Sequence, residues 1–305
     1  MIQLSATSIL LPSLFPTSWA SEWGEDEFGL YLDCNVNRIV QRFRWIVPGT
    51  FTMGSPENEA EREEDETQHF VTLTQGFWLA DSTCTQALWL AVMGNNPTFP
   101  IIIGENLFDN LSDKVKATQQ QLFSNDDLDP SLVHPVTRVS WDDVQKFIQT
   151  INAQLPDLQA RLPTEAEWEY ACRAGTITPF SFGNNITPEQ VNYHGEYSYA
   201  GAEKGLHRGR TVPVKSLPPN PWGLYEMHGN VWEWCADRYT AYPSFAVIDQ
   251  SGSVTKEYRS LRGGSWASHA GRVRSAFRDG DEANFNDGVI GFRLALGRKA
   301  SASQV

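Results

Sequence analysis

The stretch Arg259-Ser-Leu-Arg-Gly-Gly-Ser-Trp266 opens the segment that decides how this sequence is interpreted, and Gly291-Phe-Arg293 closes it. Both ends are typical of a structural framework. The Gly-Gly pair permits backbone conformations closed to other residues, and the tryptophan supplies a large apolar anchor. The apolar run 290–296 predicts a final strand. Residues 267–289 between the two ends follow neither the period of a strand nor that of a helix, so we expect a surface loop or a segment that faces a ligand.

The residues of this loop that we expect to contact a ligand are small, polar or aromatic. Phe277 and Phe285 are the expected apolar anchors, because aromatic side chains dominate the energetics of interfaces. Arg272, Asp279 and Asp281 would set specificity through their charges. The full candidate set is Ala267, Ser268, His269, Arg272, Phe277, Asp279, Asp281, Phe285, Asp287, Gly288 and Val289.

Composition and charge limit the class of protein. The chain has 305 residues, of which 41% are hydrophobic and 20% charged, and this suits a globular protein with a sizeable core. Its 11 Trp and 23 Gly indicate an irregular, loop-rich fold with aromatic anchors rather than a helix bundle. The net charge of −13 argues against nucleic-acid binding, since phosphates require a basic face, and against binding to an anionic membrane surface.

The cysteines and the first residues favour a cytoplasmic location. The four cysteines lie far apart and form no CxxC pair, so we expect reduced, buried thiols. They are Cys34, Cys84, Cys172 and Cys235. Residues 1–21 have no basic start, and Pro12 and Pro16 interrupt their apolar run. That segment is a poor signal peptide and too short to span a membrane.

Two helices have the clearest signals. Ser140 and Asp143 form a capping box ahead of apolar residues at helical spacing, and Thr164 and Glu167 form a second one. A further helix is expected over residues 83–93, where either of two threonines, at positions 83 and 85, could be the cap. Strands are predicted over residues 40–46, 69–73 and 75–80.

The remaining stretches divide the chain into one large domain with appendages. We expect an N-terminal arm over residues 1–40 and a tail over residues 299–305. The domain covers residues 41–298 and contains an insertion near 98–133, with some helix near 112–122. The acidic run 57–66 is interpreted as a solvated loop, since charge runs usually face water, although a metal site is an alternative.

Six motifs occur in a fixed order: Phe51-Thr-Met-Gly-Ser-Pro56, Pro135-Val-Thr-Arg-Val-Ser-Trp-Asp-Asp143, Arg161-Leu-Pro-Thr-Glu-Ala-Glu-Trp-Glu-Tyr170, Gly229-Asn-Val-Trp-Glu-Trp234, Arg262-Gly-Gly-Ser-Trp266 and Gly291-Phe-Arg293. This order resembles the formylglycine-generating enzyme (sulfatase-modifying factor) family, from about Arg42 to Leu296. The resemblance implies an α+β variant of the C-type lectin fold: a single irregular domain with two main helices, short antiparallel strands and long loops.

The resemblance departs at the site of the family's chemistry. The family's enzymes hold copper by two cysteines shortly after the Gly-Gly-Ser-aromatic motif and convert a substrate cysteine to formylglycine, and soft thiolates select Cu(I). This chain has no cysteine after Cys235, and His269 alone is not a copper site. Copper is therefore not expected, and we lean towards a protein that is not an enzyme. The alternative is a metal-dependent oxidase of this family with an atypical site.

The segment 267–290 also resembles the variable region of diversity-generating retroelement proteins, a subset of the family. Copying errors at adenines of Asn codons yield a residue set without Lys, Glu, Gln, Met or Trp. The segment has no Lys, Gln, Met or Trp and one Glu, Glu282. The competing interpretation is a loop that drifted after catalysis was lost. We predict a non-catalytic protein that displays a diversified C-terminal surface to an unknown protein or other macromolecular ligand, and a signalling domain is a further predicted partner.

The family also binds structural calcium, which implies two sites here. The first would use the side chains of Glu226 and Glu233 and the carbonyls of Gly229 and Val231, since hard oxygen ligands suit Ca²⁺. The alternative for this site is a buried glutamate at 233 satisfied by backbone donors. The second would use Asn192 and the Tyr193 carbonyl, but the acidic ligand of that site has no clear match in residues 202–210.

Overall fold

Each α-helix of the structure begins at a side chain that caps it. The computed structural model describes residues 12, 15, 17–98, 130–249 and 258–297, and in this part of the chain the α-helices are α1 (Gln86–Met93), α3 (Trp141–Gln154) and α4 (Glu165–Arg173). The hydroxyls of Thr85, Ser140 and Thr164 each accept a hydrogen bond from a backbone N–H three residues further on. Asp143 and Glu167 complete capping boxes, so both predicted boxes are confirmed.

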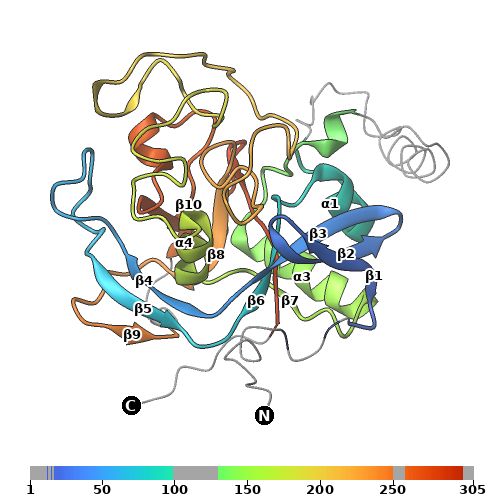
Figure 1. Cartoon of the computed structure of the whole chain (residues 1–305). Coiled ribbons are helices and arrows are strands. Elements are labelled where there is room, and N and C mark those ends of the chain that lie inside the picture. The colour runs from blue at the N-terminus through green and yellow to red at the C-terminus, as the bar shows by residue number, and fades with distance from the viewer. Residues whose placement is uncertain (1–11, 13–14, 16, 99–129, 250–257, 298–305) are drawn as a thin grey trace, which may run out of the picture.

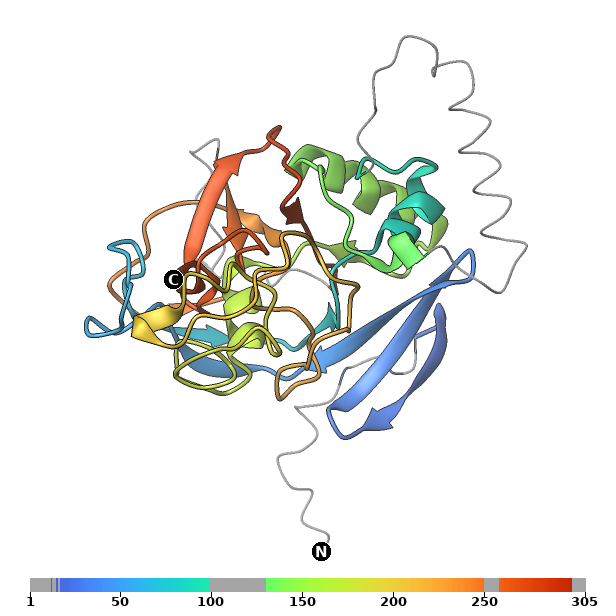
Figure 2. The same ribbon diagram turned by 90° about the horizontal axis from the view of Figure 1, so that it is seen from above.

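A six-stranded sheet, in the order β1-β2-β3-β6-β13-β7, covers one side of the main core. Its strands are β1 (Ala20–Asp26), β2 (Gly29–Val36), β3 (Ile39–Ile46), β6 (Phe77–Ala80), β13 (Ala295–Leu296) and β7 (Ala160–Arg161). Residues 20–40 therefore belong to the sheet, and the prediction of an arm over 1–40 is wrong for them. The physical reason is that Leu32, Cys34 and Val36 bury their side chains in the main core. Figure 2 shows β1–β3, in blue, on the opposite side of the molecule from the short helix drawn in yellow.

A four-stranded sheet holds the segment that opens at Arg259. Its order is β11-β10-β8-β12, with β8 (Trp232–Arg238), β10 (Tyr258–Arg262), β11 (Arg278–Glu282) and β12 (Ile290–Gly291). β11 pairs antiparallel with β10 from Tyr258↔Glu282 to Arg262↔Arg278. Residues 278–282, predicted as part of a surface loop, are thus a strand. Pairing with β10 satisfies their backbone groups, although the sequence does not alternate between apolar and polar residues.

The predicted final strand 290–296 is divided between two sheets. β12 lies parallel to β8, and β13 lies between β6 and β7 in the six-stranded sheet. Between them the carbonyls of Phe292 and Leu294 accept hydrogen bonds from the N–H groups of Cys84 and Ala80. The side chain of Arg293 turns into the interior, and the chain passes from one sheet to the other at this residue.

A three-stranded sheet and α4 complete the architecture (Figure 1). The sheet has the order β4-β5-β9, with β4 (Gly49–Met53), β5 (His69–Leu73) and β9 (Val247–Ile248). α4 packs against β4, β8 and β10. The short 3₁₀ helices are η2 (Pro130–Val133), η3 (Tyr199–Gly201) and η4 (Ala270–Val273). The four cysteines are buried and unbridged, so the prediction of reduced, buried thiols is confirmed.

Some predictions fall on residues that the structure does not describe. Residues 99–129 of the expected insertion, with its helix near 112–122, lie outside the described residues, as does the tail 299–305. None of the helices that the structure describes has the length and the apolar run needed to cross a membrane.

Candidate functional site

Arg262, the last residue of β10, is hydrogen-bonded to the middle of the 267–289 segment. The guanidinium is fully buried and donates to the carbonyls of Ser275, Ala276 and Phe277 and to the carboxylate of Glu169. These bonds hold the backbone that follows η4 against β10. Both Nη atoms are hydrogen-bonded in this way and Glu169 supplies a counter-charge, as a buried guanidinium requires, whereas the Nε has no hydrogen-bond partner and lies 3.8 Å from a Glu165 oxygen.

Arg274 anchors a second, distant part of the chain. Its guanidinium donates to Glu59 at 2.7 Å, to both carboxylate oxygens of Glu66 at 2.7 and 2.6 Å, and to the carbonyl of Glu61 at 2.6 Å. The acidic run 57–66, which we name the acidic loop, is therefore packed on the segment. The prediction of a solvated loop is wrong for Glu59 and Glu66, because the buried guanidinium requires counter-charges.

Arg278 and Arg293 complete a set of four, which with Arg262 and Arg274 we name the framework arginines. Arg278 donates to the two oxygens of Glu165 at 2.8 and 2.9 Å, and Arg293 to those of Glu233 at 2.6 Å each. Burial acts to raise the pKa of Glu165, but the arginines outweigh it and hold that pKa below its usual value. All four framework arginines are at most 3% exposed, so they fix the segment from the inside.

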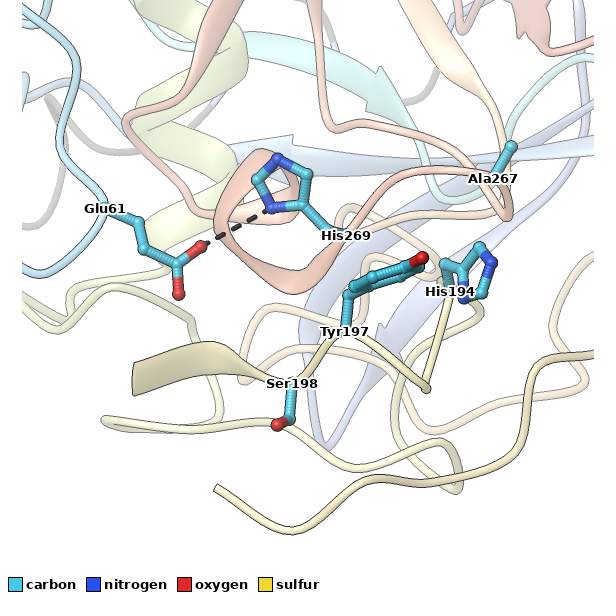
Figure 3. Close-up of a pocket in the computed structure, with 6 residues that line it drawn as sticks. All are labelled: Glu61, His194, Tyr197, Ser198, Ala267 and His269. Carbon is cyan, nitrogen blue, oxygen red and sulfur yellow. Dashed lines mark ion pairs between the residues drawn. The ribbon is translucent and has the colours of Figure 1, made fainter. Parts of the chain in front are cut away.

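An open recess of about 380 Å³ lies beside η4, and Figure 3 shows the side chains around it. It is lined by Glu61, His194, Tyr197, Ser198, Ala267 and His269. Two of its walls are bonded to each other. The N–H of His194 donates to the carbonyl of Ser268 at 2.8 Å, and the N–H of Ala270 donates to the carbonyl of Tyr197 at 3.0 Å. We name this space the recess.

Glu61 and His269 face each other across one side of the recess (Figure 3). The imidazole Nδ1 lies 3.4 Å from one carboxylate oxygen, and the other oxygen accepts the N–H of Ala200 at 3.1 Å. Burial lowers the pKa of His269, although Glu61 acts in the opposite direction. The imidazole is therefore neutral near pH 7, and the recess keeps the negative charge of the carboxylate.

Part of the predicted contact set does not reach the surface. Ala267 and His269 line the recess, but Ser268 is buried and its hydroxyl accepts the N–H of Ser265 at 3.0 Å. Phe277 is 6% exposed and packs in the main core against Trp232. The prediction of Phe277 as an interface anchor is therefore wrong, because its ring fills the core under β8.

The other predicted residues lie on η4, on β11 and on the turn that leads to β12. Asp279 and Asp281 are partly exposed, and each carboxylate accepts the N–H of the next residue. Arg272, Phe285 and Asp287 are exposed, and the phenyl ring is 40% exposed. Gly288 and Val289 are partly exposed. These residues are available to a partner, but they do not line the recess.

Four residues that line the recess were not predicted from the sequence: Glu61, His194, Tyr197 and Ser198. The carboxylate belongs to an acidic run that is far from the segment in sequence. One signal could have indicated its place, because a segment with several arginines needs counter-charges from elsewhere in a chain of net negative charge. The side chains at 197 and 198 come from a stretch without regular structure and gave no signal.

The residues of the first predicted calcium site fit a cation only in part. Glu226 is buried, its carboxylate accepts the N–H groups of Lys215 and Leu217 at 3.1 and 3.4 Å, and burial raises its pKa to about 7. A cation would offset that burial. Glu233, in contrast, already accepts from both sides of the Arg293 guanidinium and from the indole of Trp168. The carbonyls of Gly229 and Val231 complete the predicted set.

The second predicted calcium site has one free oxygen ligand. The side-chain oxygen of Asn192 is buried without a hydrogen-bond partner, and its amide nitrogen donates to Arg210 and Asn230. Tyr193 is the next residue. Within the described part of the chain, no three His, Cys, Asp or Glu side chains gather in a way that could hold a metal. Calcium stays a prediction at both sites.

Comparisons with known proteins agree on the family of this fold. Residues 35–298 match the model of the sulfatase-modifying factor enzyme 1-like domain. The formylglycine-generating enzyme of Streptomyces coelicolor is 37% identical over 172 residues, covering 53% of this chain and 52% of the relative. The inactive C-alpha-formylglycine-generating enzyme 2 of Bos taurus is 34% identical over 177 residues, covering 54% and 51%. The chain thus spans about half the length of the curated relatives it matches.

Solved structures agree on the fold over more of the chain. Variable protein 1 of Treponema denticola superposes with a TM-score of 0.66 at 24% identity, covering 87% of this chain and 98% of that protein. This likeness confirms the predicted α+β fold.

Proposed function

The chain belongs to the sulfatase-modifying factor enzyme 1-like family, and from that premise we propose that it is a non-catalytic protein that binds a protein or other macromolecule through a diversified C-terminal surface. One observation carries the proposal. The recess follows directly on the Gly-Gly-Ser-Trp motif, yet none of the chain's four cysteines lines it. All four thiols are buried elsewhere, so the soft ligands that select Cu(I) do not reach the recess.

The division of the segment supports display of a variable surface. Ala267, His269 and Arg272 are exposed, whereas Arg274 and Arg278 close to them in sequence are buried and paired. Substitutions at exposed positions away from such networks usually change stability by less than about 0.5 kcal/mol. The exposed residues can therefore be exchanged while the paired arginines keep the backbone in place.

Two of the compared proteins support this choice over an oxidase. The Bos taurus relative is named as inactive, and the Treponema denticola protein is named as variable. Their names describe those proteins, and for this chain they support a proposal only. The alternative oxidase would need a metal held by ligands other than cysteine.

A displayed library tests the binding proposal. Codons for Ala267, His269 and Arg272 would be randomised within the residue set that adenine mutagenesis permits, and the pool would be selected against several unrelated proteins. We expect binders for different targets whose melting temperatures stay within a few degrees of the parent. A matched control library randomised at Val273, Ala276 and Arg278 should lose folded protein. If the first library loses folded protein as well, or yields no binder, the proposal fails.

Metal analysis separates the alternative oxidase from the binding protein. Purified chain would be assayed for copper and iron and for oxygen consumption with a cysteine-containing peptide. The binding proposal expects neither metal in stoichiometric amount and no consumption above background. Stoichiometric copper together with oxygen consumption would establish the oxidase.

We also propose calcium as a structural ion at Glu226, because this carboxylate is buried with only backbone donors. Removing the ion with a chelator should lower the melting temperature by about 2–4 °C, as expected for a loss of about 1 kcal/mol in a protein of this size. Glu226→Gln should abolish the difference between chelated and calcium-loaded protein. An equal response of both proteins would contradict calcium at this position.

A further inference from the structure

The carboxylate of Glu61 differs from its neighbours in the acidic loop because it faces the recess. Glu59 and Glu66 form ion pairs with Arg274. Glu61, in contrast, has no arginine or lysine at ion-pair distance in the described part of the chain. Its two oxygens meet the N–H of Ala200 and the imidazole of His269. The side chain is 35% exposed, so it is reachable from the recess.

The placement of this carboxylate is fixed by the fold. Glu61 has a φ of 55°, in the left-handed region that non-glycine residues seldom adopt. Arg274 holds its carbonyl, and the hydroxyl of Tyr199 holds the carbonyl of Ala60 at 2.8 Å. The carboxylate rests on Gly271, where an added Cβ would lie 2.0 Å from the nearer oxygen. A side chain at that position would displace the carboxylate from the recess.

No positive group of the segment neutralises Glu61. His269 is uncharged near pH 7, because burial lowers its pKa. The guanidinium of Arg272 lies over the ring of Phe277 at 5.8 Å, and that of Arg274 is already paired. The recess therefore has one unneutralised negative charge at its wall.

Aromatic side chains form another part of the wall. The ring of Tyr197 is exposed and meets the ring of His194 edge-on at 4.6 Å, and His194 stacks on His207 at 3.6 Å. Cations are attracted to the faces of such rings and to carboxylates alike. A volume of about 380 Å³ is at the lower end for ligand pockets, which suits one side chain.

We propose that the recess receives a cationic side chain, a lysine or an arginine presented by a protein ligand, which pairs with the Glu61 carboxylate beside the ring of Tyr197. This inference rests on the proposed binding function and names the chemistry that the fixed part of the site selects. The exposed positions 267, 269 and 272 would then vary around a constant charge.

Small probes test this chemistry directly. N-acetyl-lysine amide and N-acetyl-arginine amide would be titrated into isotope-labelled full chain at fixed ionic strength, and the amide signals of Ala200 and Ala270 followed by NMR. N-acetyl-norleucine amide is the uncharged comparator. We expect saturable shifts with the two cations, and at least about tenfold weaker binding of the comparator, because a charged hydrogen bond is lost.

Variants assign the effect to one carboxylate. Glu61→Gln should weaken cation binding about tenfold, and Gly271→Ala should do the same by displacing the carboxylate. Glu57→Gln removes an equal charge from an exposed position of the same loop and should leave the affinity unchanged. The proposal is overturned if norleucine amide binds as well as lysine amide, or if Glu61→Gln and Glu57→Gln behave alike.

The outcome can be separated from that of the proposed function. The displayed library would be selected a second time in the Glu61→Gln background. Binders that arise equally well in both backgrounds would overturn the cationic inference and leave the binding function standing. Loss of binders in the Glu61→Gln background alone would support both. If neither background yields binders, the binding function fails and the probe titration alone decides the cationic inference.

Discussion

Arg272 and Arg274 are two residues apart and have opposite surroundings. The guanidinium of Arg274 is fully buried and meets Glu59, Glu66 and a backbone carbonyl. Arg272 is exposed, and its guanidinium lies over the ring of Phe277 at 5.8 Å. The same residue type is part of the buried framework at one position and of the exposed surface at the other. The difference teaches that this segment separates buried, paired positions from exposed ones residue by residue, and not by domain or by loop.

The native thiols are buried like the framework, and position 267 is exposed. Rates of thiol labelling test this difference, with the largest expected effect. Burial raises the pKa of Cys34 and Cys172 to about 12, so few thiolates form near pH 8 and none is accessible. Ala267→Cys places a thiol at the exposed rim. We expect it to react with a disulfide reagent at least about a thousandfold faster than the four native thiols. Native thiols that react at a similar rate would show that the interior is open.

Truncating the two arginines tests the comparison by stability. Arg274→Ala leaves two buried carboxylates unpaired and should lower the free energy of unfolding by about 3–5 kcal/mol. Arg272→Ala should lower it by less than about 0.5 kcal/mol. Urea denaturation of both variants gives the two values. Similar losses would mean that the exposed arginine is part of the framework after all.

The two phenylalanines that were both predicted as anchors provide an apolar version of the test. Phe277→Ala removes a core ring and should destabilise the fold by about 3 kcal/mol. Phe285→Ala, from a ring that is 40% exposed, should cost less than about 1 kcal/mol and change the binding of a selected partner instead. Denaturation and affinity measurements on the same preparations separate the two effects. Loss of partner binding in a folded Phe277→Ala protein would reverse the assignment.

Acidification should produce the smallest effect, several-fold in the affinity of N-acetyl-lysine amide. Burial lowers the pKa of His269, so the imidazole gains its proton only below the usual range. That proton places a positive charge beside Glu61, where it competes with the probe, and affinity falls as pH decreases from 7.5 to 5. In His269→Asn the decrease should be smaller, since the imidazole that gains the proton is gone. An affinity that rises on acidification would contradict the arrangement.

Local signals predicted much of the fold. The capping boxes at Ser140 and Thr164 involve residues three apart, so sequence alone reveals them. The strand β11 escaped prediction because its stability comes from pairing with β10, which the one-dimensional pattern of Arg278–Glu282 does not encode. The α+β fold itself was predicted from the family motifs, which also marked where the segment begins and ends.

The site was predictable only in part. Ala267 and His269 were predicted from their place after the Gly-Gly-Ser-Trp motif, and both line the recess. Glu61 was missed because its position depends on contacts between parts of the chain that are over two hundred residues apart, such as Arg274 with Glu66. Phe277 was wrongly predicted to be exposed, because the composition of a segment does not show which of its side chains face inward.

Arg262 holds the segment by the carbonyls of three consecutive residues, 275–277, and not by their side chains. A carbonyl is the same group in every amino acid, so this attachment does not read the sequence it holds. Substitutions of surface side chains would therefore leave in place the hydrogen bonds that hold this backbone. A lineage could try new side chains around the recess in many successive generations, and each variant would start from a backbone that is already in register.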